Sequence, residues 1–456
     1  MLKNTSSQAA QPADIHAQLE FSRIGMTKIQ VVFDEPEMSS DGGTLLVREA
    51  AELNGILEAM AGGIRDKRSQ AYVRHTLKEL LEQRVVQICH GYEDANDCDY
   101  LKDDLAFKAA AGRAPDDEAL ASQPTMTRLE NSVKLRDLIR LFYVFVDNFI
   151  DSYETAPECI VIDMDPTTNR VYGDQQLALF NAHFGDYCLM PFHVYEGLTG
   201  RLITTIIRPG KTPTKEEITA LLKRIVKRIR KRFPDTTIIF RADSHHTKPA
   251  VLDWAEANDV HYVLGMATNA VLRREVQPMM DWVTRVQHEE WRPCRRFHSF
   301  CYSAETWSRQ RRIVARVEAT AMGVDARFIV TDLEDAGAKF LYETVYCDRG
   351  NAELMIKEHK CFLKSSRTSC TTAEANQFRL YLHSAAYVIM HGLRHTLLRG
   401  TELASATFET IRLRLLKIAT RVETGKTFVR FHMPMSCPAA PLFSRAAALA
   451  AAARIT

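Results

Sequence analysis

Helical periodicity dominates the first third of the chain. Between residues 44 and 153, apolar residues recur every three or four positions, which is the spacing expected of helices that bury one face. Residues 1–24 are mostly polar and lack this periodicity, so we expect a mobile N-terminal segment there. A short strand is a candidate at residues 28–33. The pattern therefore predicts a helical region over residues 25–154.

The periodicity changes to that of buried strands at residue 158. Three strands, a helix, a strand, a helix and a final strand follow, at residues 158–165, 187–197, 201–210, 212–233, 236–244, 249–259 and 261–269. The first helix of this series begins with a capping box formed by Thr214 and Glu217. This order is that of a ribonuclease H-like sheet. We therefore predict an α/β fold with a ribonuclease H-like core at residues 155–269 and 340–390.

Two further regions complete the chain. Short apolar runs at residues 295–304, 311–322, 326–333 and 340–347 predict more strands, so we expect a β-rich insertion subdomain at 270–339 that interrupts the core. The C-terminal stretch returns to a helical pattern, with eight Lys or Arg against three Asp or Glu between positions 391 and 432. This composition predicts a basic helical region at residues 391–456.

The composition restricts the class of protein but does not indicate a function. Hydrophobic residues make up 46% of the chain and charged residues 25%, as in globular proteins, and the net charge of +2 requires any nucleic-acid surface to be local. The ten cysteines form no C-x-x-C pair and no signal peptide is recognisable, which predicts reduced thiols in the cytoplasm. The longest apolar run, residues 138–150, contains Arg140 and Asp147 and is too short to span a membrane.

One stretch, YCDRGNAELMIKEHK, carries a polar pattern that a helix would align. Tyr346, Arg349, Glu353 and Lys360 fall within roughly 60° of one another on an ideal α-helix. A carboxylate beside two cations and a phenol suits a site that holds a metal ion and a phosphodiester. A solvated helix face with ion pairs explains the same pattern, and the stretch alone does not choose between them.

Two aspartates end predicted strands of the core. A ribonuclease H-like sheet brings Asp165 and Asp243 together, and Glu353 joins them if its helix packs beside the central strands. Three carboxylates at one point repel unless cations lie between them, which predicts two Mg²⁺ ions about 3.5–4 Å apart and metal-dependent phosphoryl transfer. Asp163 is a rival for the first position, because residues two apart on a strand face the same side.

These motifs resemble those of a known family. The spacing of Tyr346, Arg349, Glu353 and Lys360 matches the Tyr-Arg-Glu-Lys signature of DDE transposases from bacterial insertion sequences. The stretches IDMDPTTN and RADSH resemble the motifs of the first and second aspartates. SSDGG, GYEDANDCDYL, ASQPTMTRLEN and ANQFRLYLHSAAY resemble stretches of the transposases called DDE domain group one, over about residues 25–440.

The resemblance implies a function and its parts. It implies cut-and-paste transposition, with DNA cleavage through hairpin ends and strand transfer. Asp165, the aspartate of the relatives' Asp-x-Thr pattern, would bind metal with Asp243 and Glu353, with Mg²⁺ as cofactor and Mn²⁺ as a substitute. Tyr346, Arg349 and Lys360 would bind DNA. The expected partners are double-stranded DNA, both terminal inverted repeats and target, and a second copy of the chain in a synaptic dimer at the bacterial nucleoid.

Other residues have weaker claims. Hairpin-forming relatives stack an aromatic on a flipped base, and Trp291 is the first candidate because Arg292, Arg295 and Arg296 are near; Trp282 and Trp307 are alternatives, and each tryptophan also suits a core. The basic run at 223–232 suits a solvated face or DNA contact, and residues 122–130 suit a recognition helix or a plain helix start.

Two adjacent histidines follow the second aspartate. His245 and His246 are expected on opposite faces of an extended stretch, which argues against a zinc site. His246 also stands where relatives usually have an aromatic residue.

Two rival functions stay open at this point. One is a nuclease without strand transfer, and the other is a domesticated DNA-binding protein without catalysis.

Overall fold

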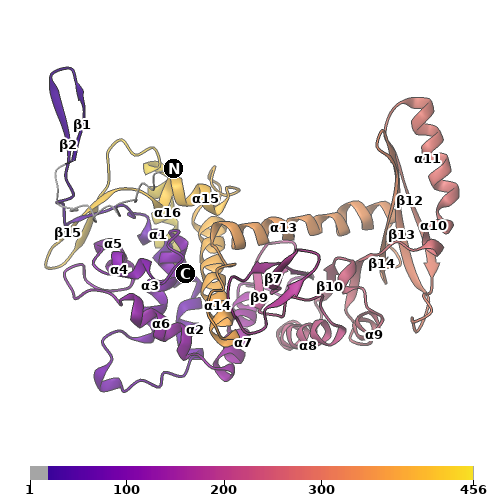
Figure 1. Ribbon diagram of the computed structural model, residues 1–456, viewed down its shortest axis with the longest axis horizontal. Helices are drawn as coiled ribbons and strands as arrows, with labels where there is room; N and C mark the ends of the chain where they lie inside the picture. Colours follow the sequence, from indigo (N-terminus) through magenta and orange to yellow (C-terminus); the bar gives the residue numbers. More distant parts are fainter. Residues whose placement is uncertain (1–18, 455–456) are drawn as a thin grey trace, which may run out of the picture.

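The computed structural model describes residues 19–454 and shows an elongated molecule (Figure 1). A helical body forms one end, a sheet with flanking helices forms the middle, and a sheet extension with one long helix forms the other end. Most of the predicted mobile segment, residues 1–18, lies outside the described residues. Within them, no helix combines the length and apolarity needed to cross a membrane.

An eight-stranded sheet runs through the middle of the molecule in the order β12-β13-β14-β11-β10-β4-β8-β9. Five of its strands come from the predicted core: β4 (Cys159–Pro166), β8 (Phe192–Glu196), β9 (Leu202–Ile206), β10 (Thr237–Ala242) and β11 (His261–Met266). Strand β10 pairs in parallel with both β4 and β11, whereas β8 pairs antiparallel with β4 and β9. The carboxyl ends of β4, β10 and β11 therefore lie at one edge of the sheet.

Helices cover this sheet. Figure 1 shows α8 (Lys215–Arg232) and α9 (Pro249–Ala257) on one side, while α7 (Leu135–Asp151) and α14 (Ala373–Gly392) contact β9. The predicted capping box opens α8, since Thr214 accepts from the backbone of Glu217, and its apolar stripe is buried while its basic residues face outward. Nearly every residue of α14 is buried, so this helix forms the centre of the molecule.

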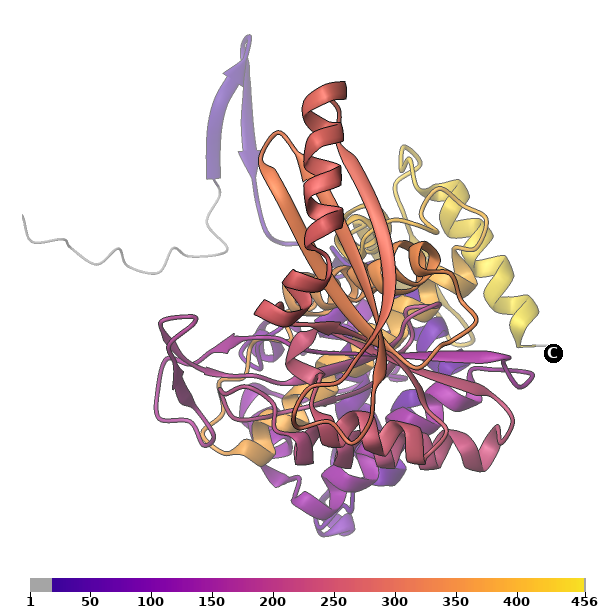
Figure 2. The same cartoon turned by 90° about the vertical axis from the view of Figure 1, so that its right-hand side faces the viewer.

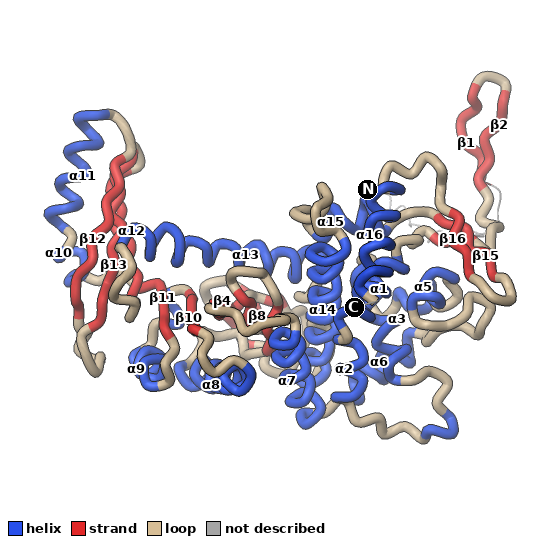
Figure 3. Tube along the Cα trace, turned by 180° about the vertical axis from the view of Figure 1, so that it is seen from behind, coloured by secondary structure: helices blue, strands red, loops and turns tan. Residues whose placement is uncertain are grey.

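The insertion differs from the prediction in two ways. Its first residues are helical, as α10 (Ala270–Glu275) and α11 (Gln277–Glu290), before the strands β12 (Cys294–Tyr302), β13 (Arg311–Thr320) and β14 (Gly323–Thr331). Strand β14 also pairs antiparallel with β11, so the insertion extends the core sheet (Figure 3). Phe328 pairs with Met266, the last residue of β11, and residues 323–327 therefore continue beyond the core's carboxyl-end edge (Figure 2).

Residues 340–347 were expected to form a strand, and this prediction was wrong. They belong to an irregular helix made of α12 (Ala338–Phe340), a π-helical turn (Leu341–Tyr346), a 3-10 turn (Cys347–Arg349), α13 (Gly350–Lys357) and a second π-helical turn (Glu358–Phe362). A short apolar run does not reveal its period, and here Leu341 and Tyr342 pack on Val263, Val314 and Ile329 of the sheet. Packing against the sheet therefore decided the conformation.

The N-terminal body is helical, with α1 (Thr44–Asn54), α2 (Ile56–Gly63), a 3-10 turn (Gln70–Tyr72), α3 (Leu77–Cys89), α4 (Asp97–Leu101), α5 (Leu105–Ala110) and α6 (Gln123–Ser132). A hairpin of β1 (Leu19–Ile24) and β2 (Thr27–Val31) projects from it, where a short strand was a candidate (Figure 1). A small sheet of β5 (Asn169–Arg170), β6 (Leu179–Asn181) and β7 (Asp186–Leu189) follows β4. Pro191, which lacks a backbone N–H, lies between β7 and β8 and divides the long strand that we predicted.

The C-terminal region is less helical than predicted. It contains a π-helical turn (Leu393–Leu397), α15 (Phe408–Ile411), another π-helical turn (Arg412–Leu416) and α16 (Ala440–Ala453), but also β15 (Thr420–Thr424) and β16 (Val429–His432). These strands form a sheet with β3 (Met38–Ser39) from the other end of the chain. A strand partner so remote in sequence leaves no trace in local periodicity.

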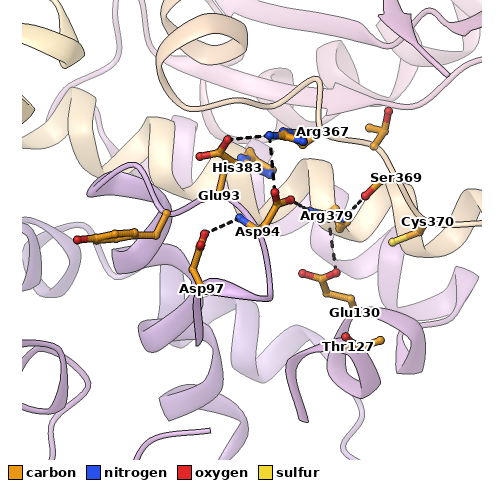
Figure 4. Close-up of polar contacts among 12 residues, drawn as sticks. Glu93, Asp94, Asp97, Thr127, Glu130, Arg367, Ser369, Cys370, Arg379 and His383 are labelled. Atoms are coloured by element: carbon orange, nitrogen blue, oxygen red, sulfur yellow. Dashed lines mark hydrogen bonds and ion pairs between the residues drawn. The ribbon is translucent and has the colours of Figure 1, made fainter. Parts of the chain in front are cut away.

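Ion pairs, buried at Glu130 and exposed at Arg367, join the N-terminal body to α14 (Figure 4). Arg379 of α14 lies 3.4 Å from Asp94 and 3.6 Å from Glu130, and Arg84 lies 3.4 Å from Glu130 on its other side. Arg367 adds a contact of 3.2 Å to Glu93. Three of the stretches that resemble the transposases, at 91–101, 121–131 and 375–387, therefore meet at this junction.

Close packing explains why the stretch SSDGG has a glycine at position 43. Gly43 lies against the C-terminal chain, and a Cβ atom there would come within 2.4 Å of Leu416 Cα and 2.5 Å of the Leu415 carbonyl oxygen. We expect Gly43→Ala to lower the free energy of unfolding by about 1–3 kcal/mol through overpacking. Gly62→Ala is the matched control, because its Cβ meets no atom within 4 Å and Ala favours the helix by about 0.5–1 kcal/mol. Urea unfolding measures both; equal stability of the two variants would contradict the prediction.

Candidate active site

The end of β4 carries two aspartates in different environments. Asp163 is 1% exposed and accepts two hydrogen bonds from Arg241, at 2.6 and 2.7 Å. Arg241 is its direct neighbour on β10, so the strand register itself creates this pair. Asp165, two residues on, has no such partner on β10 and its side chain is 21% exposed. Of the two rivals from the sequence, Asp165 is therefore the carboxylate that remains accessible.

Asp243 follows β10 and is held by both histidines. Its two oxygens contact His245 Nδ1 at 2.7 Å and His246 Nδ1 at 2.8 Å. The expectation that the two rings face opposite sides was wrong, because residues 244–246 form a 3-10 turn rather than an extended stretch. Burial raises the pKa of Asp243, but the hydrogen bonds and charge of His246, followed by those of His245, outweigh it and bring the pKa below its ordinary range.

The irregular helix brings three of the four predicted residues to this edge. Arg349 contacts Asp165 Oδ2 at 3.5 Å and Glu353 Oε1 at 3.2 Å, so its guanidinium bridges the two carboxylates. Tyr346 lies against the end of β11, where a Cβ on Gly265 would come within 2.5 Å of its hydroxyl oxygen. Glu353 itself is 62% exposed.

Lys360 is placed differently from the other three. Its Nζ donates to Thr167 Oγ1 at 3.2 Å and to the carbonyl of Thr168, in the turn after β4. The helix contains π and 3-10 turns between Tyr346 and Lys360, so the alignment calculated for an ideal α-helix does not extend to it. Lys360 thus anchors the chain that leaves Asp165 rather than touching the carboxylates.

The three carboxylates share one electrostatic environment. The pKa of Asp165 is raised to about 7, chiefly by burial and then by the charges of Asp243 and Glu353, while Arg349 opposes the rise. Carboxylate oxygens that repel one another in this way are the donors that Mg²⁺ prefers, so the residues fit a divalent cation chemically. In the described conformation, residues 19–454 hold no group of three His, Cys, Asp or Glu positioned to ligate an ion, and the Arg349 guanidinium supplies the positive charge.

A cavity of about 470 Å³ adjoins this edge. It lies between the irregular helix and strands β13 and β14, and its lining includes Ser244, Gly265, Arg316, Arg327, Tyr346 and Arg349. Arg316 and Arg327 both pair with Asp325, which also lines the cavity, at 3.0 and 2.9 Å, so one acid offsets part of the charge of the three guanidinium groups. The remaining positive charge and the aromatic ring suit a negatively charged, aromatic ligand such as a nucleotide.

Trp291 differs from the other tryptophans of the insertion. It is 87% exposed and has a left-handed backbone with φ of 53°, which is uncommon for a bulky residue. Trp282 lies under Arg296 at 4.6 Å, and Trp307 packs against Tyr302 at 5.5 Å. Cys294, three residues after Trp291, pairs with Ala319 near the far end of the β13–β14 hairpin. Trp291 therefore lies at the end of the sheet that overhangs the carboxylate edge.

Its basic neighbours are mostly paired. Arg292 contacts Glu290 at 2.5 Å, and Arg295 contacts Glu318 at 2.6 Å and Glu343 at 2.8 Å. The basic run of α8 is also partly paired, since Arg228 contacts Asp147 and Arg230 contacts Asp259.

Arg241 is the residue that sequence reasoning missed. Besides Asp163, it donates to the carbonyl oxygen of Val345 at 2.6 Å, so it ties the irregular helix to the sheet. The available signal was a charged residue inside an otherwise apolar strand, which requires a buried partner.

Replacement by asparagine should change the stability of the protein in opposite directions at the two aspartates of β4. A carboxyl whose pKa rises from about 3.9 unfolded to about 7 folded is protonated more readily in the folded state, so stability falls as the pH rises between those values. In EDTA, Asp165→Asn should therefore raise Tm at pH 8, with little change at pH 4. Burial also raises the pKa of Asp163, to about 6, against the opposing effect of Arg241. At pH 8, where this carboxylate is ionised, Asp163→Asn should nevertheless cost about 3–5 kcal/mol, because it leaves the buried Arg241 guanidinium without its counter-charge. Calorimetry at both pH values tests this; a stabilising Asp163→Asn would reverse the assignment.

Comparison with known proteins places the chain in a family. Residues 21–454 match the family described as transposase DDE domain group 1. No curated protein matches the chain. Among solved structures, a cryo-EM structure of the piggyBac transposase synaptic complex with hairpin DNA aligns with 82% of this chain and 80% of its own, at 12% identity and a TM-score of 0.42. The match over nearly the whole sequence shows that this chain belongs to the transposase DDE domain group 1 family.

Proposed function

We propose that the protein is the transposase of a bacterial insertion sequence, which cleaves the ends of its element and joins them to target DNA by a cut-and-paste route. The observation that carries this proposal is the convergence of three carboxylates at one edge of the sheet: Arg349 contacts Asp165 and Glu353, and Asp243 follows the neighbouring strand β10. The strand order β9-β8-β4-β10-β11, with β4, β10 and β11 parallel, supports a ribonuclease H-like core at 155–269 and 340–390.

The proposed cofactor is a pair of Mg²⁺ ions, for which Mn²⁺ substitutes. Asp165, Asp243 and Glu353 would hold them. When bound, they would supply activation of the attacking oxygen and stabilisation of the leaving oxygen in phosphoryl transfer. His245 and His246 orient Asp243 through its two oxygens, and Arg241 keeps Asp163 from competing for the same position.

The remaining site residues hold DNA. Arg349 and Tyr346 line the cavity beside the carboxylates, where they contact the phosphodiester and orient it for cleavage. Lys360 fixes the turn after Asp165 and adds positive charge next to the path of the strand. Trp291, on the overhanging insertion at 270–339, offers an exposed ring on which a base that leaves the helix stacks during hairpin formation.

The rest of the chain completes the proposed assembly. The helical body at 25–154 and the basic region at 391–456 bind the terminal inverted repeats, and two copies of the chain hold two element ends in a synaptic dimer. Such an enzyme works on target DNA at the bacterial nucleoid, in the cytoplasm.

The carboxylates give the direct test. Asp165→Asn, Asp243→Asn and Glu353→Gln should each abolish cleavage while DNA binding persists, because each removes a ligand charge. A supercoiled plasmid that carries the element with its flanking DNA is incubated with Mg²⁺, and nicked and joined products are followed beside a gel shift. Asp186→Asn, an exposed acid paired with Arg170, is the control that should keep activity. Normal cleavage by any of the three variants would refute the site, and cleavage without joined products would identify a nuclease.

Hairpin formation tests Trp291. The ring is exposed, so Trp291→Ala should leave Tm nearly unchanged. The variant should still make the first nick, but nicked DNA should accumulate because a stacking platform worth about 1–3 kcal/mol per base is lost. Denaturing gels of end-labelled DNA separate the nick from the hairpin. Trp307→Ala is the matched control: its ring packs in the sheet, so a drop in Tm with a normal hairpin fraction is expected. A normal hairpin yield from Trp291→Ala would remove this role.

A further inference from the structure

The N-terminal body contains a second concave basic surface, far from the carboxylates. A hollow of about 630 Å³ lies between the loop before α3, the loop before α6 and the start of α6. We call it the basic hollow and define it by six lining residues, Arg68, Arg74, His75, Lys102, Glu118 and Arg128. Figure 1 shows α6 at the end of the molecule opposite the insertion, with α13 between them.

Three of the four arginine and lysine residues of the basic hollow, Arg74, Lys102 and Arg128, form no ion pair within residues 19–454. Arg68 is the exception, since it pairs with Asp66 at 2.7 Å. Within the described chain, Arg128 reaches only the Thr125 hydroxyl, at 3.1 Å. Charges gathered in a concavity without counter-ions raise the local potential and attract an anion. The hydroxyls of Ser122 and Thr125 and the exposed ring of Tyr72 also line it.

Hydrogen bonds hold the backbone that surrounds the hollow. Arg113 donates to the Arg74 carbonyl at 2.8 Å, and the Leu120 backbone N–H donates to the Lys102 carbonyl at 2.8 Å. These two bonds hold the backbone at Arg74 and at Lys102. The third unpaired cation, Arg128, lies on the exposed face of α6, whose buried face carries Glu130.

The basic hollow is also fixed relative to the carboxylates. Glu130 joins α6 to Arg379 of α14, the central helix (Figure 4). Helix α14 is the next helix in the chain after the irregular helix, and its His383 donates from Nδ1 to the Leu363 carbonyl oxygen, 2.6 Å away and just past Lys360. A ligand in the hollow is therefore held in a constant position relative to the carboxylate edge.

We infer that the basic hollow binds the sugar-phosphate backbone of duplex DNA and so sets the position of the cleaved bond. This rests on the proposed function in one respect, that the protein acts on DNA. Three unpaired cations around one concavity match successive phosphates, and contacts of this kind fix register without reading sequence. DNA held at the hollow and at the carboxylates lies along the length of the molecule.

The test removes the three unpaired cations together. The variant R74A/K102A/R128A is compared with K211A/R273A/R285A, which removes the same charge from three exposed residues that form no ion pair within residues 19–454 and lie outside the regions assigned to the terminal repeats. Fluorescence anisotropy with element-end and unrelated duplexes is measured in EDTA over a range of salt. Each lost phosphate contact lowers the slope of log affinity against log salt by about 1, so a fall of about 3 is expected, with both duplexes weakened equally.

Three further measurements sharpen the outcome. Glu118→Gln removes the acid at the rim, so it should tighten binding. Phosphate ethylation interference on end DNA should lose a set of backbone positions in the hollow variant alone. Replacing chloride with inorganic phosphate at equal ionic strength should barely affect wild-type binding. Strong competition by phosphate that disappears in R74A/K102A/R128A would instead identify a site for free phosphate and overturn the inference.

Failure of the inference and failure of the proposed function are distinguishable. If wild type binds DNA and the two triple variants have the same affinity and salt slope, with equal Tm, the hollow does not hold DNA whatever the carboxylates do. If cleavage is absent from wild type but the hollow variant alone loses binding, the inference holds and the enzymatic proposal fails.

Discussion

The parallel pairing of β4 with β10 is the constraint on which the site depends. This register sets Asp163 opposite Arg241, and a pair 1% exposed on both sides must be fully hydrogen bonded to be tolerated. Arg241 satisfies both carboxylate oxygens and then the Val345 carbonyl. Gly197 has no Cβ for the same reason, since one would come within 2.5 Å of Arg241 Nη2. One buried ion pair therefore aligns two strands and docks the helix that carries Arg349 and Glu353.

This arrangement separates the structural acid from the accessible ones. Both oxygens of Asp163 are bound by Arg241, so Asp165, Asp243 and Glu353 are the carboxylates that share the partly exposed edge at the strand ends. Burial, and then the charges of Asp243 and Glu353, raise the pKa of Asp165, so an ionised carboxylate at this edge carries an energetic cost. Arg349 reduces that cost in the described conformation, and its position between two carboxylates is the position in which a phosphate-binding cation is useful.

The insertion and the N-terminal body extend the same frame in opposite directions. Because β14 pairs with β11, the insertion is a continuation of the core sheet. The strand register therefore fixes how far Trp291 lies beyond the carboxylate edge. At the other end, Glu130, Arg84 and Arg379 tie α6 to α14. The basic hollow, the carboxylates and the exposed tryptophan are thus three points of one continuous framework.

Local pattern in the sequence was enough for much of this. The helices at 44–151, the order of strands and helices from 159 to 266 and the family motifs are properties of short segments, since periodic burial and residue spacing act within one element. The nearness of Asp165 and Asp243 followed from the strand order, whereas the approach of Glu353 depended on how its helix packs beside the central strands. What the sequence could not supply were contacts between remote segments: Arg241 with Asp163, 78 residues apart, β15 with β3, and β14 with β11. Those contacts decided which aspartate is free, turned residues 340–347 into a helix and merged the insertion with the core, because packing energy between distant elements outweighs local preference.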